Sequence, residues 1–363
     1  MTRIIFIQPA VPNYRIPFFE TIKEKLNIRI ITAESDFLNV KTVYNSKCVS
    51  ILPGFLSFFK GSLFWMRGLS LYSEYKKGDI VVINGNPRIM NYMLLLFFCK
   101  MRGIKTVWWG HGWSAGSFGF LAKIRLLIMK SLSDYQLFYT DTEKDLINSK
   151  NAYALNNGLD SDLYKEIIND VNITRVLPSI KGRFDLVFIG RITDKSNFIL
   201  LLHALSKVVG NIHLNVIGTS ENINKYKKEA EKINVSSKIT WYGAVFDDIA
   251  ITKIMMNSHA FVYAGSVGLS LIHAFNYGLP AIIHSSSKYH MPEYAAFSNG
   301  INGFNFIENN EESLSKVIDD MSKISDAEYK VLSLNALRTI STTFNINDMS
   351  QRFLKLIEDI KCQ

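Results

Sequence analysis

The sequence predicts a parallel α/β fold built from two doubly wound domains in tandem. Short apolar runs alternate with longer amphipathic stretches, which is the pattern of strands and helices around a parallel sheet. The alternation stops at the polar segment 169–181, the predicted linker, and then starts over. A glycine-bearing loop at residues 263–268 follows a predicted strand, and such sheets bind ligands at the carboxyl ends of their strands.

The first predicted domain is residues 1–168, and the second is residues 182–345. Strands of the first are predicted at residues 4–8, 28–32, 80–84, 105–109 and 135–139, with amphipathic helices near 16–26, 87–101 and 121–132. Strands of the second are predicted at residues 186–189, 212–217, 239–242, 260–263 and 281–284, again separated by helices. Residues 346–363 are predicted to form a C-terminal helix that can cross back to the first domain.

The composition is that of a globular protein. Of the 363 residues, 48% are hydrophobic, which is enough for two buried cores. The longest apolar run, residues 92–99, is far short of the ~18 residues that span a bilayer, so no membrane-spanning helix is expected. The three cysteines lack metal-binding spacing and indicate neither a disulfide framework nor a zinc site, which favours the reducing cytosol.

The formal net charge of +9 indicates an anionic partner, which can be nucleic acid, acidic lipid or a phosphorylated small molecule. Without a basic tail, zinc-finger spacing or an aromatic-basic RNA motif, nucleic acid is not expected. Residues 56–72 mix aromatic and cationic side chains, as at an anionic bilayer surface. They include Phe58, Phe59, Phe64, Trp65 and Met66 among Lys60 and Arg67. The alternative is a segment packed on its own domain, and a second membrane candidate is the stretch 118–132.

The loop at residues 263–268 has the chemistry of a phosphate site. Gly265 and Gly268 allow the backbone to approach a ligand closely. The free N–H groups at the start of the following helix, together with its positive dipole end, favour an anion there. An ordinary turn between a strand and a helix is the alternative interpretation.

Several motifs occur in order along the chain. The first half contains Gln8-Pro9 with Tyr14-Arg15-Ile16-Pro17-Phe18-Phe19, then Gly110-His111-Gly112, then Asn156-Asn157-Gly158-Leu159-Asp160. The second half contains Val187-Phe188-Ile189-Gly190-Arg191, Leu214-Asn215-Val216-Ile217-Gly218, Trp241-Tyr242-Gly243, and Gly268-Leu269 with His273-Ala274 and Gly278-Leu279-Pro280. In order and spacing these motifs resemble those of GT-B glycosyltransferases of family 4, also called glycosyl transferases group 1. The resemblance implies two Rossmann-like domains facing a cleft, an N-terminal one for the acceptor and a C-terminal one for the nucleotide sugar.

The resemblance also implies a retaining reaction that needs no metal and no cofactor. Arg191, which follows Gly190 at a strand end, and Lys195 would then neutralise the leaving diphosphate. A surface ion pair is the alternative for Arg191. The lysine is shifted by one position from the family pattern, because Ser196 occupies the position where the family has its lysine.

The donor site departs from the family pattern at two positions. The family has two glutamates separated by seven residues, and this chain has Gly265 and His273 there. His273 can hydrogen-bond a ribose hydroxyl, and the acidic residue of a later segment is present as Glu293. The sugar and phosphates are expected on the backbone N–H groups of Ser266, Val267, Gly268 and Leu269. The pattern resembles a variant subgroup of bacterial surface-polysaccharide enzymes.

His111 lies between two glycines after a predicted strand, and the resemblance implies contact with the transferred sugar. The alternative is a structural histidine that bonds a loop carbonyl. On the acceptor side, Arg15 can meet a phosphate and Tyr14 can stack on a sugar, while Arg88 is a weaker candidate.

The expected function is sugar transfer from a nucleotide-diphosphate sugar to a polyprenyl-diphosphate-linked oligosaccharide of a bacterial O-antigen or capsule. The expected location is the cytoplasmic face of the inner membrane, where the protein is peripheral. One alternative is a catalytically silent partner that binds nucleotide sugar and supports an active transferase. The missing glutamates favour this alternative. Another is a nucleotide-sugar 2-epimerase, whose acid and base carboxylates are not visible in the sequence.

Overall fold

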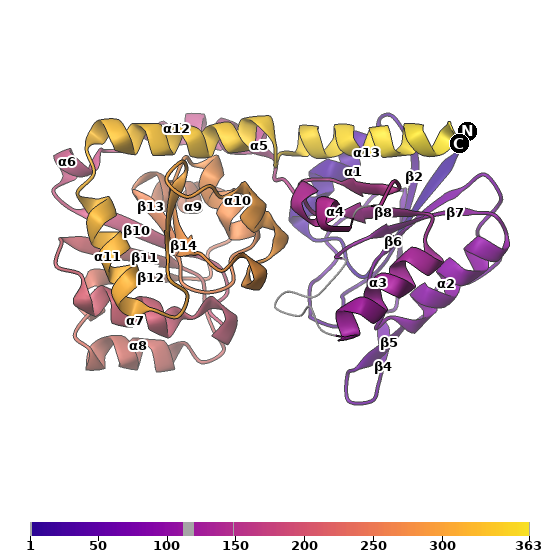
Figure 1. Cartoon of the computed structure of the whole chain (residues 1–363), viewed down its shortest axis with the longest axis horizontal. Helices are drawn as coiled ribbons and strands as arrows, with labels where there is room; N and C mark the ends of the chain where they lie inside the picture. The colour runs from indigo at the N-terminus through magenta and orange to yellow at the C-terminus, as the bar shows by residue number, and fades with distance from the viewer. Residues whose placement is uncertain (1, 112–119, 148, 363) are drawn as a thin grey trace. The chain divides into compact units, whose positions relative to one another are not determined.

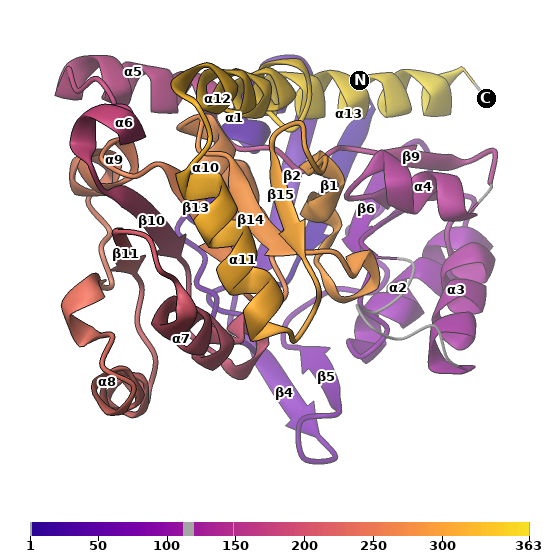
Figure 2. The ribbon, with the colours of Figure 1, turned by 60° about the vertical axis from the view of Figure 1, so that its left-hand side comes forward.

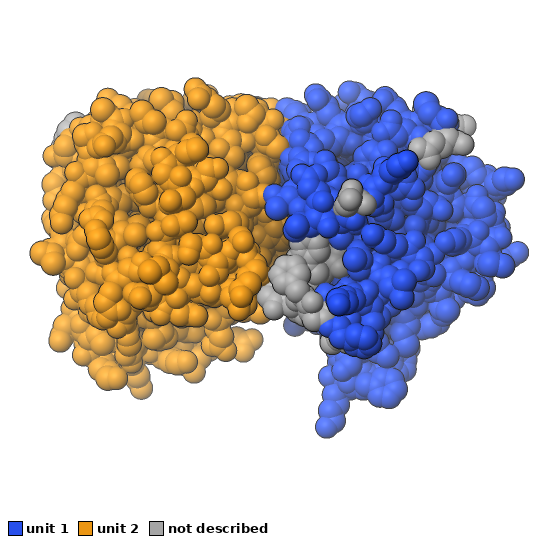
Figure 3. Space-filling view, viewed as in Figure 1, with its two compact units in different colours: residues 1–159, 346–363 blue, residues 160–345 orange. Residues whose placement is uncertain are grey.

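The computed structural model describes residues 2–111, 120–147 and 149–362. The chain forms two compact units, Met1–Leu159 with Ile346–Gln363, and Asp160–Asn345 (Figure 3). The predicted linker 169–181 therefore lies inside the second unit, where it contains the end of α5 (Ser161–Val171) and all of α6 (Pro178–Lys181).

Arg175 explains why this polar segment belongs to the second unit. Its Nε donates to the carbonyl of Ser258 at 2.8 Å, and its Nη2 donates to the carbonyls of Tyr277 at 2.8 Å and Met255 at 3.2 Å. These carbonyls lie at the carboxyl ends of two helices, where a cation is favourable. The segment looks like a linker by composition, but one half-buried guanidinium fixes it to the domain.

The first unit has a seven-stranded parallel sheet in the order β3-β2-β1-β6-β7-β8-β9. The strands are β1 (Arg3–Gln8), β2 (Asn27–Ala33), β3 (Val49–Leu52), β6 (Ile80–Asn84), β7 (Lys105–Trp109), β8 (Tyr135–Phe138) and β9 (Ala152–Ala154). The helices are α1 (Ile16–Lys23), α2 (Met90–Met101), α3 (Phe120–Leu132), α4 (Asp141–Ile147) and α13 (Ile346–Lys361). The strands read as continuous apolar runs because both faces of the sheet are covered.

Alternate residues of β1 point into two cores. Ile4 and Phe6 pack with α1 and α13 on one face, and Ile5 and Ile7 pack with α2 and α3 on the other. Figure 1 shows α13, the C-terminal helix, beside α1. The last segment of the chain is thus part of the core of the first unit.

Residues 55–66 form an antiparallel hairpin of β4 (Phe55–Phe58) and β5 (Leu63–Met66) that projects from the first unit (Figures 1 and 2). Within the predicted membrane stretch, Phe64 and Met66 are buried, whereas Phe58 and Phe59 near the turn are exposed. The side chain of Asn91 in α2 bonds both the N–H and the carbonyl of Met66, at 3.1 and 2.8 Å. Phe64 and Met66 of the predicted interface stretch therefore belong to the core.

The second unit has a six-stranded parallel sheet in the order β12-β11-β10-β13-β14-β15. The strands are β10 (Phe184–Ile189), β11 (Ile212–Ile217), β12 (Ile239–Gly243), β13 (Ala260–Tyr263), β14 (Ala281–His284) and β15 (Gly303–Phe306). The remaining helices are α7 (Phe198–Lys207), α8 (Ile223–Lys232), α9 (Asp248–Met256), α10 (Leu269–Asn276), α11 (Glu311–Ser322) and α12 (Asp326–Thr342). Figure 2 shows α11 beside α7 on one face of the sheet. Within the described residues, no helix is both long and apolar enough to cross a membrane.

Candidate functional site

The carboxyl ends of the strands in the first unit surround a hollow of about 160 Å³. Gln8, Asn84 and Trp109 end β1, β6 and β7, and Tyr139 follows β8. Parallel strands place their carboxyl ends at the same edge of the sheet, which is the usual ligand edge of such domains.

Arg15 lies on this hollow, as does Tyr14. The Arg15 guanidinium donates from Nη1 to Oδ1 of Asn157 at 3.0 Å and lies 5.1 Å from the ring centre of Trp109. These contacts hold it in one place while it still lines the hollow. The arrangement suits recognition of an anionic acceptor group.

His111 follows β7, and its ring nitrogen Nδ1 lies 2.9 Å from Oε1 of Glu143 in α4. The other carboxylate oxygen of Glu143 accepts from the backbone N–H of Tyr139 at 3.0 Å. Glu143 is buried, and the Tyr139 ring packs on the imidazole with ring centres 4.6 Å apart. The carboxylate therefore accepts from Nδ1–H, which leaves Nε2 as the nitrogen for another partner.

The partner of His111 is thus a carboxylate, not the loop carbonyl of the alternative interpretation. No motif in the sequence pointed to Glu143. The neighbouring Gly112 lies outside the described residues.

Arg88 is not part of this hollow as the structure places it. Its guanidinium donates to the carbonyls of Gly61 and Ser62 and lies 5.0 Å from the ring centre of Phe64. The backbone N–H of Phe64 in turn donates to the carbonyl of Arg88 at 2.7 Å. Arg88 binds the β4–β5 hairpin to the start of α2.

In the second unit, the predicted phosphate loop packs against the loop that contains Lys195. The backbone N–H of Ser266 donates to the carbonyl of Lys195 at 2.9 Å. A Cβ at Gly265 would lie 2.0 Å from that same carbonyl oxygen, so only glycine allows this approach. The side chain of Lys195 is exposed, whereas Ser196 is buried and its hydroxyl bonds the backbone of Thr193. The backbone of Lys195 is thus next to the glycine loop, although the register of this residue differs from the family pattern.

Two of the four expected N–H donors are already used by the protein. That of Ser266 bonds Lys195, and that of Val267 donates to Nδ1 of His290 at 3.1 Å. For the N–H groups of Gly268 and Leu269, at the start of α10, the described residues provide no partner. The anion-binding capacity of the loop is therefore concentrated at these two positions.

Glu293 is buried beside the glycine loop. A Cβ at Gly268 would lie 3.7 Å from Oε2 of Glu293 and 3.2 Å from the side chain of Met291. The backbone N–H of Met291 donates to the carbonyl of Val267 at 2.9 Å. The structure thus brings Glu293 and the backbone of Lys195 to the glycine loop.

Gly190 and Arg191 follow β10 directly. A Cβ at Gly218 would lie 1.9 Å from the carbonyl oxygen of Gly190, so the turns after β10 and β11 approach as closely as backbones can. The Arg191 side chain is exposed. Burial raises the pKa of the Tyr263 hydroxyl to about 12, and the positive charge of Arg191 opposes this rise. Arg191 is therefore near the carboxyl end of β13, at the ligand edge of this sheet.

His273 lies one turn into α10, and its ring packs against Tyr164 and Tyr277 with ring centres 5.1 and 5.5 Å apart. Burial lowers the pKa of His273 to about 4. The imidazole is therefore neutral near pH 7 and can both donate and accept a hydrogen bond.

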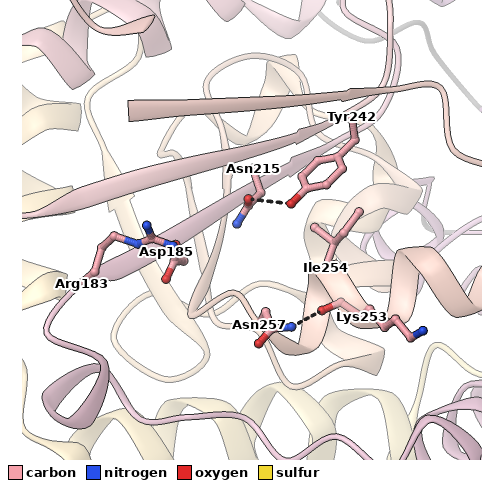
Figure 4. Close-up of a pocket in the computed structure, with 7 residues that line it drawn as sticks. All are labelled: Arg183, Asp185, Asn215, Tyr242, Lys253, Ile254 and Asn257. Carbon is pink, nitrogen blue, oxygen red and sulfur yellow. Dashed lines mark hydrogen bonds and ion pairs between the residues drawn. The ribbon is translucent and has the colours of Figure 1, made fainter. Parts of the chain in front are cut away.

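The second unit contains a hollow of about 330 Å³ between α9 and strands β10 to β12 (Figure 4). Arg183 and Asp185 form an ion pair at 2.9 Å there, and the hydroxyl of Tyr242 donates to Oδ1 of Asn215 at 3.4 Å. Asp185 is near the amino end of β10, so this hollow is separate from the glycine loop. Across residues 2–111, 120–147 and 149–362, no three His, Cys, Asp or Glu side chains come together in a way that could hold a metal ion.

Comparison with known proteins adds a family and a fold. Residues 171–337 match the family model of glycosyl transferases group 1, and no curated protein gives a significant sequence match. HepE of Anabaena in complex with UDP is 11% identical with a TM-score of 0.72, covering 99% of this chain and 100% of that chain. Sucrose-phosphate synthase from Thermosynechococcus elongatus is 13% identical with a TM-score of 0.71, covering 100% of both chains. The lipopolysaccharide outer core galactosyltransferase WaaB, in its apo form, is 16% identical with a TM-score of 0.69, covering 99% of both chains.

These likenesses confirm the predicted fold class, GT-B with two Rossmann-like domains. The family match lies within the second unit, where the glycine loop, Arg191 and Lys195 are found.

Proposed function

We propose that this chain, whose residues 171–337 match the family model of glycosyl transferases group 1, is a retaining glycosyltransferase that uses a nucleotide-diphosphate sugar and needs no metal. An acceptor hydroxyl attacks the anomeric carbon on the side from which the diphosphate leaves. The bond from that carbon to the diphosphate oxygen breaks, and a phosphate oxygen takes the proton of the hydroxyl. Electrostatic support of the departing diphosphate is the main contribution of the protein.

The observation that carries the proposal is the contact between the Lys195 loop and the glycine loop. The backbone of Lys195, a residue with a cationic side chain, packs on the loop that leads to the N–H groups of Gly268 and Leu269 at a helix start. Arg191, on the same loop as Lys195, adds a guanidinium that can bind two phosphate oxygens. Together they provide the positive charge that a metal ion supplies in other transferases.

The net charge and the similar structures support a choice of donor and acceptor to test. HepE is described in complex with UDP and with UDP-glucose, so a uridine diphosphate sugar is the first donor to test. WaaB is named as a lipopolysaccharide outer core galactosyltransferase. With the net charge of +9, this supports a lipid-linked glycan acceptor of a surface polysaccharide, used at the cytoplasmic face of the inner membrane.

In the first unit we assign the acceptor to the hollow lined by Tyr14 and Arg15. Arg15 would bind an acceptor phosphate, and Tyr14 would stack on a sugar. His111, oriented by Glu143, is assigned to the transfer step.

A second candidate function is a catalytically silent partner of an active transferase. The observation that favours it is the absence of both family glutamates, since Gly265 and His273 stand in their places. A neutral His273 can still hydrogen-bond a ribose hydroxyl, but it does not supply the negative charge of a glutamate.

The test is incubation of the purified protein with a panel of nucleotide sugars. A transferase shows slow hydrolysis of one donor and a raised melting temperature with the matching nucleotide. Addition of a lipid-linked acceptor then gives a glycosylated product. If the protein binds a nucleotide but neither hydrolyses nor transfers the sugar of any donor, the result supports the silent partner. If it binds no nucleotide at all, both candidate functions are overturned.

A further inference from the structure

The α2 helix leaves an apolar stripe on the surface. Leu94, Phe97 and Met101 are exposed, and Met101 is 71% exposed. They recur at helical spacing on the face opposite to the buried residues of α2, such as Leu95 and Cys99. Large apolar side chains grouped in this way are uncommon on a surface that contacts only water.

The α3 helix repeats this pattern. Phe120, Ile124 and Leu127 are exposed at spacings of four and three residues, and Leu127 is 67% exposed. Lys123 and Lys130 are also exposed on this helix. A stripe of apolar side chains flanked by lysines is typical of a helix that lies on a membrane surface.

The two helices pack against one another, as Figure 1 shows for the first unit. Nζ of Lys100 in α2 donates to the carbonyl of Ser131 in α3 at 2.5 Å. The exposed residues of the two helices therefore belong to neighbouring elements, and we call them the α2–α3 face. The face consists of Leu94, Phe97, Met101, Phe120, Ile124 and Leu127 with Lys100, Lys123 and Lys130.

The sequence around this face contains cations and no acids. Residues 80–133 hold seven lysines and arginines and neither aspartate nor glutamate. Soluble surfaces normally mix both signs of charge. An anionic surface is the partner that this charge distribution complements.

We propose that the α2–α3 face docks on an anionic phospholipid bilayer. The apolar stripes enter the headgroup boundary, and the lysines pair with lipid phosphates. A second copy of the chain fits less well, because a symmetric contact through this face would bring lysines against lysines. The proposal deepens the membrane location in the proposed function, and it names the surface responsible.

The proposal differs from an assignment to the hairpin stretch 56–72. In that stretch Phe64 and Met66 belong to the core, and the large apolar side chains exposed on the hairpin are Leu56, Phe58 and Phe59, at and near its turn. The α2–α3 face offers more exposed apolar side chains and more cations than this turn.

The test is co-sedimentation of the whole protein with vesicles of phosphatidylglycerol and phosphatidylcholine. The wild type should sediment at low salt, release as salt screens the lysines, and bind pure phosphatidylcholine vesicles weakly. A Phe97→Ser, Leu127→Ser, Lys123→Glu variant should lower the partition coefficient by at least about tenfold. Because all three side chains are exposed, its melting temperature should not change.

The matched control is Val331→Ser, Leu334→Ser, Lys330→Glu on α12, which also changes two exposed apolar residues and one lysine. It should sediment as the wild type does. Equal sedimentation of the face variant and the control overturns the proposal, as does loss of binding with Phe58→Ser, Phe59→Ser alone. A wild-type dimer that the face variant makes monomeric, without vesicle binding, assigns the face to a second copy instead.

Nucleotide binding in solution separates this proposal from the proposed function. The face variant should bind nucleotide as the wild type does, since the substitutions lie in the first unit and the glycine loop lies in the second. Failure of both proteins to bind nucleotide counts against the transferase, whatever the vesicles show.

Discussion

His111 owes its orientation to Glu143, a buried carboxylate 32 positions later in the chain. In Glu143→Gln, the amide has to keep an acceptor for the N–H of Tyr139 and so presents its NH2 to His111, which reverses the tautomer of the ring. We expect kcat to fall by about a hundredfold, the effect of removing one transition-state contact, with little change in the donor KM.

Glu143→Asp keeps the negative charge and should recover part of the lost kcat. A purely structural carboxylate would instead lower the melting temperature and leave kcat per folded molecule intact. Steady-state kinetics and thermal unfolding of both variants distinguish these outcomes.

Arg191 gives a second prediction at this scale. If its exposed guanidinium neutralises the diphosphate, Arg191→Ala should lower turnover by on the order of a hundredfold. Chelating agents should leave the wild-type rate unchanged. Arg338→Ala on α12, also an exposed arginine, is the control. A strict requirement for magnesium or manganese, or full activity of Arg191→Ala, contradicts the assignment.

At the residue scale, sequence alone could locate the glycine loop and rank Arg88 below Arg15, but it could not show what Arg88 binds. Arg15 and Arg88 each follow a strand and a proline-containing loop. Arg15 lines the hollow at the strand ends, and Arg88 instead bonds carbonyls of the hairpin. Glu143 was not predicted at all, because a pairing across 32 residues exists only once the strands have aligned.

At the scale of elements, the glycine loop depends on His290. Its Nδ1 accepts from the N–H of Val267, and its Nε2–H donates to the carbonyl of His284 at 2.9 Å. Burial lowers the pKa of His290 to about 3 and also lowers the pKa of the stacked His284. The ring must remain neutral because a protonated Nδ1 cannot accept.

This predicts an acid-sensitive second unit. An unfolded histidine titrates near pH 6.5, so as the pH falls from about 6.5 towards 3 only the unfolded chain takes up the proton. Stability is present above pH 6.5 and is lost as the pH falls, with a slope of at most about 1.4 kcal/mol per pH unit for each histidine. Denaturant unfolding at pH 7 and pH 5 measures the slope. His290→Asn, which can keep an acceptor without titrating, should reduce it, and an unchanged slope would rule out His290 as the source.

The central strands of the two parallel sheets were predicted, and of the strands at their edges only β12 was, at residues 239–242. β6, β7, β11, β13 and β14 have the predicted bounds, because strands covered on both faces read as unbroken apolar runs. The edge strands β3, β9 and β15 were not predicted. They are three or four residues long and partly exposed, so their sequences lack that pattern.

At the scale of the whole molecule, the chain leaves its first unit at Leu159 and returns to it at Ile346. The returning helix α13 buries Met349, Phe353 and Leu356 completely. Composition could predict the helix and its amphipathic pattern. It could not define the boundary at 159/160, because polar residues near Arg175 resemble a linker although they bond helix ends.

A substitution of Phe353 tests whether α13 is part of the core of the first unit. Its ring packs against Phe6 of β1 and Phe18 of α1 with ring centres 5.3 and 5.6 Å apart, so the end of the chain fills the core of its beginning. Phe353→Ala should destabilise the first unit by about 3–5 kcal/mol, through lost apolar burial and the cavity left behind. The second unit has its own sheet and should keep its stability, so calorimetry should show one transition moving down and one unchanged. Leu334→Ala, at an exposed position of α12, is the control and should move neither. If both transitions shift together in Phe353→Ala, the two units unfold as one cooperative block and not as separate cores.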